Sequence, residues 1–250
     1  MSKVTEIATE IATEIKRIQD AKADIKTAIE NKGVTVGDGT IATYAEKIGE
    51  ISSGGGINLL DYAITAPTFQ GADFTDIPNV VANIPNFNGK NINAMFNLTT
   101  NLETVKLICN IRDVAMETTT AFYSSRTLRV IDLSEFNTLF STVTSTFGSC
   151  VSLEEIIGTI SFAGTSPFTN TFGQCDKLRE IRIAENCISK NISFSACSLL
   201  SADSVNSIIG GLVDLTEGTS QTLTFHKTVG GNLTDEQKAI ITAKNWELVY

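Results

Sequence analysis

The chain has little of the chemistry that most catalytic and metal sites require. Its 250 residues include one histidine, His226, and no C-x-x-C pair. A structural zinc site of the usual kind needs several cysteine or histidine ligands. A catalytic site in which a histidine activates a serine or cysteine nucleophile would have to use His226, which lies in the strand-like segment 223–227. We therefore expect no catalytic residue, no metal and no cofactor, and a protein that is not an enzyme.

Positive charge and long apolar runs are also scarce. The net charge is −9, and lysine and arginine form no cluster, whereas phosphate binding needs a basic face. We expect no nucleic acid partner, and no membrane insertion because no apolar run is long enough. Residues 1–30 are too charged for a signal peptide, which favours assembly in a bacterial cytoplasm. Five cysteines, an odd number, argue for free thiols rather than a disulfide framework.

What the chain does have is an internal repeat of 25 or 26 residues. In each copy a phenylalanine is followed three residues later by a small residue, then by leucine and by β-branched residues. The repeats begin at Phe96, Phe122, Phe147 and Phe172, with a shortened copy at Phe194. A period in this range predicts stacked units, because one copy cannot bury its own apolar face.

The end of each repeat predicts a short strand. Leu128, Ile131 and Leu133 are apolar and alternate with Val130 and Asp132, which is the period of a half-buried strand. Parallel stacking would place equivalent residues about 4.8 Å apart. We expect a phenylalanine ladder inside the stack, with the small third-position residues at the turns. These are Thr99, Ser125, Cys150, Cys175 and Cys197.

The motif F-x-x-C-x-x-L-x-x-I-x-I fits the copies that begin at Phe147 and Phe172, although Gly158 replaces the last aliphatic residue of the first. This pattern resembles the bacterial-surface (BspA-like) leucine-rich repeat. The copy at Phe96 departs from it, since Thr99 stands where that family has cysteine. The resemblance implies a leucine-rich-repeat solenoid and a role in adhesion or recognition, but fold alone does not fix activity.

The strand residues that point outward form the candidate binding surface. They make two rows across the stack: Thr104, Val130, Glu155 and Glu180, and beside them Lys106, Asp132, Ile157 and Arg182. The alternative is purely structural, because opposite charges on adjacent strands stabilise a sheet without binding anything.

The N-terminal residues predict an amphipathic helix with a narrow isoleucine stripe. Apolar residues recur every three or four positions, as in one face of a helix. They are Val4, Ile7, Ile11, Ile15, Ile18, Ile25 and Ile29. We expect these residues to join several copies of the chain, and isoleucine at most of them favours three. The alternative is a helix that packs on its own globular domain.

Residues 22–48 run from a helix into K-G-V-x-V and then into T-x-x-x-Y-A-x-x-I. This segment resembles a module near the N-termini of bacteriophage tail and fibre proteins, and the resemblance implies attachment or oligomerisation in a virion. Residues 52–56, S-S-G-G-G, predict a flexible linker.

Beyond residue 200 the repeat gives way to the pattern of a cap. We expect a helix from Ser201 to Gly210–Gly211, a strand at Leu223 and Phe225, a helix opened by a Thr234–Gln237 capping box and a last strand that contains Trp246. Trp246 fits the core of this cap better than a ligand site. At the other end, residues 74–84 carry a weak first repeat that starts at Phe74.

Together these patterns predict an α+β chain: an N-terminal coiled-coil helix, a small α/β collar, a β-rich leucine-rich-repeat solenoid and an α/β cap. The expected domains are 1–30 for oligomerisation and attachment, 31–56 for the collar and linker, 57–200 for the solenoid and 201–250 for the cap. The expected function is a bacteriophage virion appendage, a tail or head fibre. We expect a homotrimer that is attached to capsid or tail and adheres to host-surface glycan or protein. The alternatives are a glycan depolymerase of a phage tail and a bacterial cell-surface adhesin.

Overall fold

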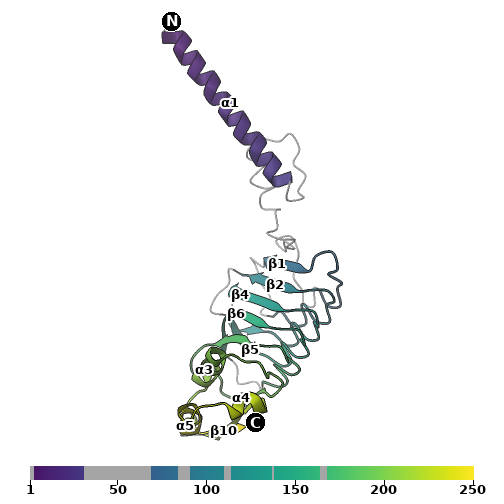
Figure 1. Ribbon diagram of the computed structural model, residues 1–250, viewed down its shortest axis with the longest axis vertical. Helices are drawn as coiled ribbons and strands as arrows, with labels where there is room; N and C mark the ends of the chain where they lie inside the picture. The colour runs from purple at the N-terminus through teal and green to yellow at the C-terminus, as the bar shows by residue number, and fades with distance from the viewer. Residues whose placement is uncertain (1–2, 31–68, 84–90, 110–113, 137, 164–167) are drawn as a thin grey trace. The chain divides into compact units, whose positions relative to one another are not determined.

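The computed structural model describes residues 3–30, 69–83, 91–109, 114–136, 138–163 and 168–250 (Figure 1). The chain divides into two compact units, Met1–Ser53 and Gly54–Tyr250, and each is described here by itself. The expected repeat region 57–200 and cap 201–250 thus belong to one unit, called the body below. The collar and linker predicted at 31–56 lie outside the described residues.

The described part of the first unit is one helix, α1 (Lys3–Glu30). Its sequence has no proline or glycine and is rich in alanine, glutamate and lysine, which are strong helix formers. Ion pairs one turn apart join Lys16 to Asp20 and Arg17 to Glu14 along its surface. The helix predicted at the N-terminus is therefore present.

The body is built mainly from strands that run parallel to one another. Among the described residues one sheet contains β1 (Asn79–Asn83), β2 (Thr104–Ile108), β3 (Met116–Glu117), β4 (Val130–Glu135), β5 (Leu139–Thr142), β6 (Glu155–Phe162) and β7 (Glu180–Ile183). A second sheet contains β8 (Ile192–Phe194), β9 (Gln221–Phe225) and β10 (Trp246–Val249). Strands β1, β2, β4 and β6 follow one another down the body in chain order (Figure 1).

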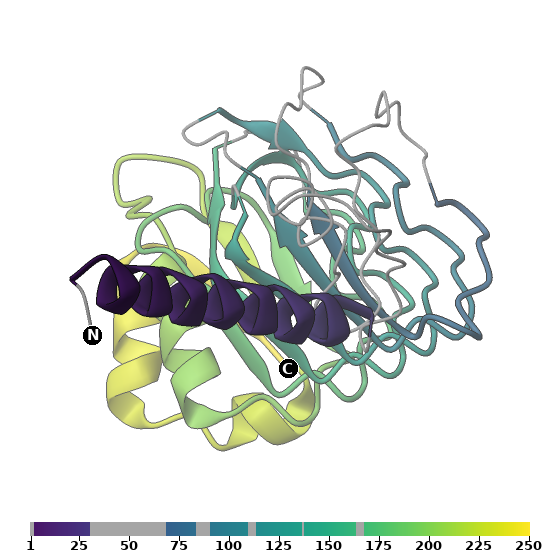
Figure 2. The same cartoon turned by 90° about the horizontal axis from the view of Figure 1, so that it is seen from above.

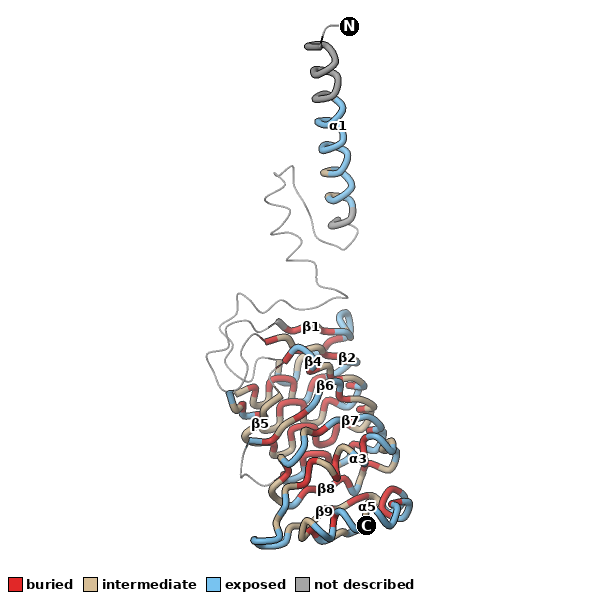
Figure 3. Tube along the Cα trace, turned by 90° about the vertical axis from the view of Figure 1, so that its left-hand side faces the viewer, coloured by how far each residue is buried: buried red, intermediate tan, exposed pale blue. Residues whose placement is uncertain are grey.

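A stack of phenylalanine rings runs through the body. The rings of Phe96 and Phe122 lie 5.7 Å apart at 4°, and those of Phe122 and Phe147 lie 5.8 Å apart at 7°. Phe172 and Phe194 continue the stack as predicted. The sequence did not predict its two ends, which are Phe69 and Phe225. Buried residues fill the inside of the body along its length (Figure 3).

Each repeat turns at backbone positions with positive φ. These positions lie two residues before and two after each phenylalanine of the regular repeats, as at Thr120 and Ser124 around Phe122. Left-handed backbone costs a residue other than glycine about 1 kcal/mol. Hydrogen bonds to the next repeat accompany this strain: the Phe122 N–H donates to the Thr146 oxygen at 2.9 Å, and the Ser124 N–H to the Gly148 oxygen at 2.8 Å. The loops of successive repeats therefore follow the same path (Figure 2).

Strand β6 curls the sheet because it belongs to two rows of paired strands, one that contains β4 and one that contains β5. Its first residues pair with β4, whereas Ser161 and Phe162 pair with β5. Between these regions Gly158 has a φ of 103°, and the register to β7 shifts, which is the geometry of a bulge. The bulge turns β6 from one row into the other.

The predicted fold class is wrong. The described residues form a curled sheet of parallel strands with few helices, and not an α+β chain with a coiled coil and a leucine-rich-repeat solenoid. The repeat period correctly indicates stacked units, but it does not reveal the second row, β3 and β5, that joins the first through β6. At the other end, α1 is one helix whose described isoleucines face solvent. An isoleucine stripe establishes an amphipathic helix and does not establish a coiled coil.

Helices α3 (Ala202–Gly211), α4 (Lys227–Gly231) and α5 (Asp235–Ala243) lie at the end of the body opposite β1 (Figure 1). The elements expected between residues 201 and 250 are confirmed, including the Thr234–Gln237 capping box. Helix α4 was not predicted. Trp246 is buried, and its indole N–H donates to the Val213 oxygen at 2.9 Å, so it belongs to the core as expected.

Candidate functional site

The first row of predicted binding residues lies in register across four strands. Thr104 pairs with Val130, Val130 with Glu155, and Glu155 with Glu180. Asn79 of β1 extends the row, because the Thr104 hydroxyl donates to its Oδ1 at 2.7 Å. The period of the sequence therefore placed these side chains together on the outer face of the sheet.

The second row is continuous only in part. Lys106, Asp132 and Ile157 are in register, but Arg182 pairs with Thr159 rather than with Ile157. The Gly158 bulge causes this shift, since it lengthens β6 relative to β7. Ile157, an apolar residue that is 36% exposed, lies where the register between β6 and β7 shifts. The predicted placement of Arg182 beside Ile157 is wrong.

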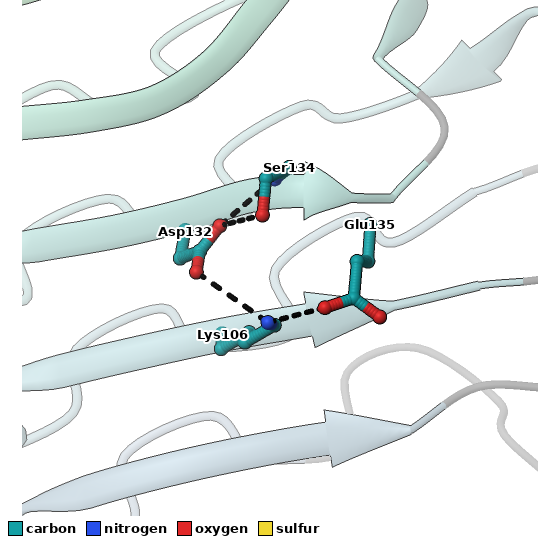
Figure 4. A network of polar contacts seen from close by, with 4 residues as sticks. All are labelled: Lys106, Asp132, Ser134 and Glu135. Carbon is teal, nitrogen blue, oxygen red and sulfur yellow. Dashed lines mark hydrogen bonds and ion pairs between the residues drawn. The ribbon is translucent and has the colours of Figure 1, made fainter.

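Two charged side chains of the second row, Lys106 and Asp132, form an ion pair with each other (Figure 4). The Lys106 ammonium lies 3.8 Å from Asp132 Oδ2 and closer to Glu135 Oε1. The hydrogen bond to Glu135, with the charge of Asp132, holds the pKa of Lys106 above its usual value. Asp132 also accepts hydrogen bonds from the Ser134 N–H at 2.9 Å and from its hydroxyl at 2.6 Å. These contacts favour the structural interpretation of the row.

A further row of charges lies seven residues after the phenylalanines of the four regular repeats, and the sequence analysis missed it. The charges alternate in sign along the row, which consists of Glu103, Arg129, Glu154 and Arg179. The backbone N–H of Arg129 donates to the Glu103 carbonyl oxygen, and the same bond joins Glu154 to Arg129 and Arg179 to Glu154. The Arg129 guanidinium lies 3.3 Å from both oxygens of Glu154. This hydrogen bonding raises the pKa of Arg129 and lowers that of Glu154. The fixed seven-residue offset from each phenylalanine was the signal that could have revealed it.

Asp73, which precedes β1, lacks the raised pKa expected of a general acid. Asp73 accepts hydrogen bonds from the Asn101 amide at 2.9 Å and from the Thr75 hydroxyl at 2.8 Å. These bonds lower the pKa of Asp73, whereas a general acid of a glycosidase needs a raised one. His226 caps α4, where its Nδ1 accepts from the Thr228 N–H at 3.1 Å.

The described part of the isoleucine stripe faces solvent. Ile15, Ile18 and Ile25 are 50%, 53% and 40% exposed. The side chains of Val4, Ile7, Ile11 and Ile29 lie outside the described residues. Solvent-facing isoleucines on a charged helix leave apolar area available to a partner.

One depression among the described residues of the body was not predicted from the sequence. It has a volume of about 400 Å³ and lies among the turn after β8, the start of α3, helix α4 and the start of α5. Buried Val205, Val229 and Leu233 form its floor, and Leu199 stands 42% exposed at its rim. We call it the cap pocket. Its lining comes from segments up to about 40 residues apart, with no shared motif.

Within the described ranges, no group of three or more histidine, cysteine or acidic side chains is placed to hold a metal ion. None of the described helices is both long enough and apolar enough to cross a membrane. The five cysteines form no disulfide with one another, as predicted, and four of them are buried. Comparison of the chain with protein families, curated proteins and solved structures found no match.

Proposed function

We propose that the chain is a structural part of a bacteriophage particle, a tail or head fibre, which self-associates through α1 and adheres to the host surface through its body. Three observations support this: an exposed isoleucine stripe, a separate body of stacked repeats and the resemblance of residues 22–48 to a phage fibre module. The observation that carries the proposal is the exposure of Ile15, Ile18 and Ile25 on a helix that belongs to a different compact unit from the body.

Self-association follows from the energetics of α1. Burying an isoleucine side chain stabilises an assembly by roughly 1.5–3 kcal/mol. The charged side chains of the helix lie outside the stripe, where they stay in water when copies meet. We put the assembly at three copies, because isoleucine at most contact positions favours more than two helices. The same unit would attach the fibre to capsid or tail proteins.

Adhesion is the role proposed for the body. A stack of repeats presents equivalent side chains at a regular spacing, which suits a surface for recognition. The virion is the proposed location. A glycan depolymerase and a cell-surface adhesin remain the competing functions, and the experiments below separate them from a fibre.

The oligomer is tested by light scattering of the full chain after gel filtration. We expect a trimeric mass for the unchanged chain and a monomeric mass for Ile15→Asp plus Ile18→Asp. The matched control is Ala23→Asp plus Thr27→Asp, which adds the same charge to a different face of α1 and should leave the trimer intact. A monomeric unchanged chain would overturn self-association.

Location and activity need two further measurements. Electron micrographs of phage particles that carry an epitope tag on this chain should show label at the fibres, and unlabelled particles would overturn the virion assignment. Incubating the chain with host polysaccharide should release no new reducing ends. Released sugar would favour the depolymerase instead.

A further inference from the structure

The floor of the cap pocket is apolar and branched. Val205 of α3, Val229 of α4 and Leu233 of the following turn are at most 8% exposed. Leu199 and Leu200 flank them at the rim. A floor of methyl groups attracts an aliphatic part of a ligand, and it offers no aromatic face on which a flat ring could stack.

The rim offers hydroxyl and amide groups whose side-chain hydrogen bonds are unused. Within the described residues, no partner is found for the side chains of Ser198, Thr228 and Asn232, which line the pocket at its exposed edge. Beside them Thr234 and Gln237 are fixed by their mutual hydrogen bonds of 2.8 and 3.2 Å. The rim is therefore held in place on one side and able to bond a ligand on the other.

The lining carries no ionisable side chain, which disfavours a charged ligand, because a buried charge needs a partner. The volume of about 400 Å³ falls in the range of small-molecule sites. A compact, uncharged ligand with hydroxyl groups and one methyl group matches this combination.

We propose that the cap pocket binds a neutral sugar residue that carries a methyl group, as an N-acetyl or a 6-deoxy group. The methyl group lies on Val205, Val229 and Leu233, and the sugar hydroxyls bond Ser198, Thr228 and Asn232. The inference rests on the proposed adhesive function and deepens it, since it names the class of glycan and moves recognition from the charged sheet face to the cap.

Titration of the full chain by calorimetry and ligand-observed NMR tests this inference. The probes are N-acetylglucosamine, N-acetylgalactosamine, L-rhamnose and L-fucose. Glucose and galactose serve as controls without the methyl group, and glucuronate as a charged control. We expect at least one methyl-bearing sugar to bind about tenfold more tightly than the controls. Equal binding of all probes, or binding of none, would overturn the inference.

Two variants place the binding in the pocket. Thr228→Trp fills the rim and should weaken binding by about tenfold or more, whereas Lys227→Trp adds the same ring one residue outside the lining and should not. If Thr228→Trp lowers the melting temperature, Asn232→Ala decides instead, with an expected loss of about fivefold for one hydrogen bond. Binding unchanged in both Thr228→Trp and Asn232→Ala would contradict the proposal.

Adhesion to host cells separates this inference from the function on which it rests. If the unchanged chain adheres and Thr228→Trp adheres equally well, the sugar site is wrong while adhesion stands. If the unchanged chain does not adhere at all, the proposed function fails, and sugar binding in the pocket would then be a separate property.

Discussion

The Cys175 thiol donates a hydrogen bond to the backbone oxygen of Phe147, with Sγ and O 3.0 Å apart. Cys150 makes the same bond one repeat earlier at 2.9 Å, and the Ser125 hydroxyl makes it in the repeat before that. The third position of the repeat is thus a donor to the preceding repeat as well as a small residue. This explains why serine and cysteine both occur there.

Replacing this donor should show its contribution. We expect Cys175→Ser to be more stable than Cys175→Ala by about 1 kcal/mol, because the hydroxyl keeps the bond to Phe147 and the methyl group cannot. Urea unfolding of the full chain measures the difference. The exposed Ser220→Ala serves as the control and should change stability by less than about 0.5 kcal/mol. An alanine variant as stable as the serine variant would show that only size matters.

The buried thiols should also make stability depend on alkaline pH. Burial raises the pKa of Cys150 and of Cys197 to about 12 from an ordinary 9.0. Between pH 9 and 12 the unfolded chain therefore loses protons that the folded chain keeps. The stability is fully present below pH 9, and each thiol should lower the free energy of unfolding by about 1.4 kcal/mol per pH unit in this window.

Urea midpoints measured from pH 8 to pH 11 check this expectation. Other groups titrate in the same window, so the informative quantity is a difference between chains. The double variant Cys150→Ser plus Cys197→Ser should lose stability less steeply with pH than the unchanged chain. Parallel slopes would mean that the two thiols ionise as easily in the folded state as in the unfolded one.

The features predictable from the sequence were those repeated at a fixed interval or encoded by a local motif. Phenylalanines 25 or 26 residues apart gave the central ring stack, and a Thr234–Gln237 capping box gave the start of α5. The ends of the stack were missed because the repeat motif does not follow them: Thr75 and Gly231 stand six residues after Phe69 and Phe225, where the repeat has leucine.

Features that arise from turn geometry could not be predicted in this way. Ser124 and Ser149 adopt positive φ without being glycine, because hydrogen bonds to the next repeat hold them there. The pairing of β5 with the end of β6 depends on these turns and on one bulge. The register of the two outer rows was predicted correctly up to that bulge. The cap pocket was not predicted, because α3, α4 and α5, which line it, share no sequence pattern.

The bulge itself can be tested at Gly158. Its φ of 103° is strained for any side chain, and a Cβ there would lie 3.0 Å from the carbonyl carbon of Leu133. We expect Gly158→Ala to lower the free energy of unfolding by about 1–3 kcal/mol. Gly210→Ala is the matched control, since a Cβ there meets open space within α3 and should be neutral or stabilising by up to about 1 kcal/mol. Equal effects at both glycines would argue against strain at the bulge.

The phenylalanine stack should be most sensitive at its centre. The Phe147 ring is fully buried and lies 5.8 and 5.4 Å from the rings of Phe122 and Phe172. Phe147→Ala removes contacts with both neighbours and leaves a cavity, so we expect a loss of about 3–5 kcal/mol. Phe69 is only partly buried and has one stacked neighbour, so Phe69→Ala should cost clearly less.

Phe147→Leu separates the shape of the ring from its volume. Leucine keeps an apolar side chain at the centre of the stack but loses the offset ring contacts, which contribute about 0.5–1.5 kcal/mol beyond buried area. We expect its stability to fall between those of the unchanged chain and Phe147→Ala in urea unfolding. If Phe69→Ala proved as costly as Phe147→Ala, each ring would stabilise only its own repeat. The contacts between repeats would then not be what holds the stack together.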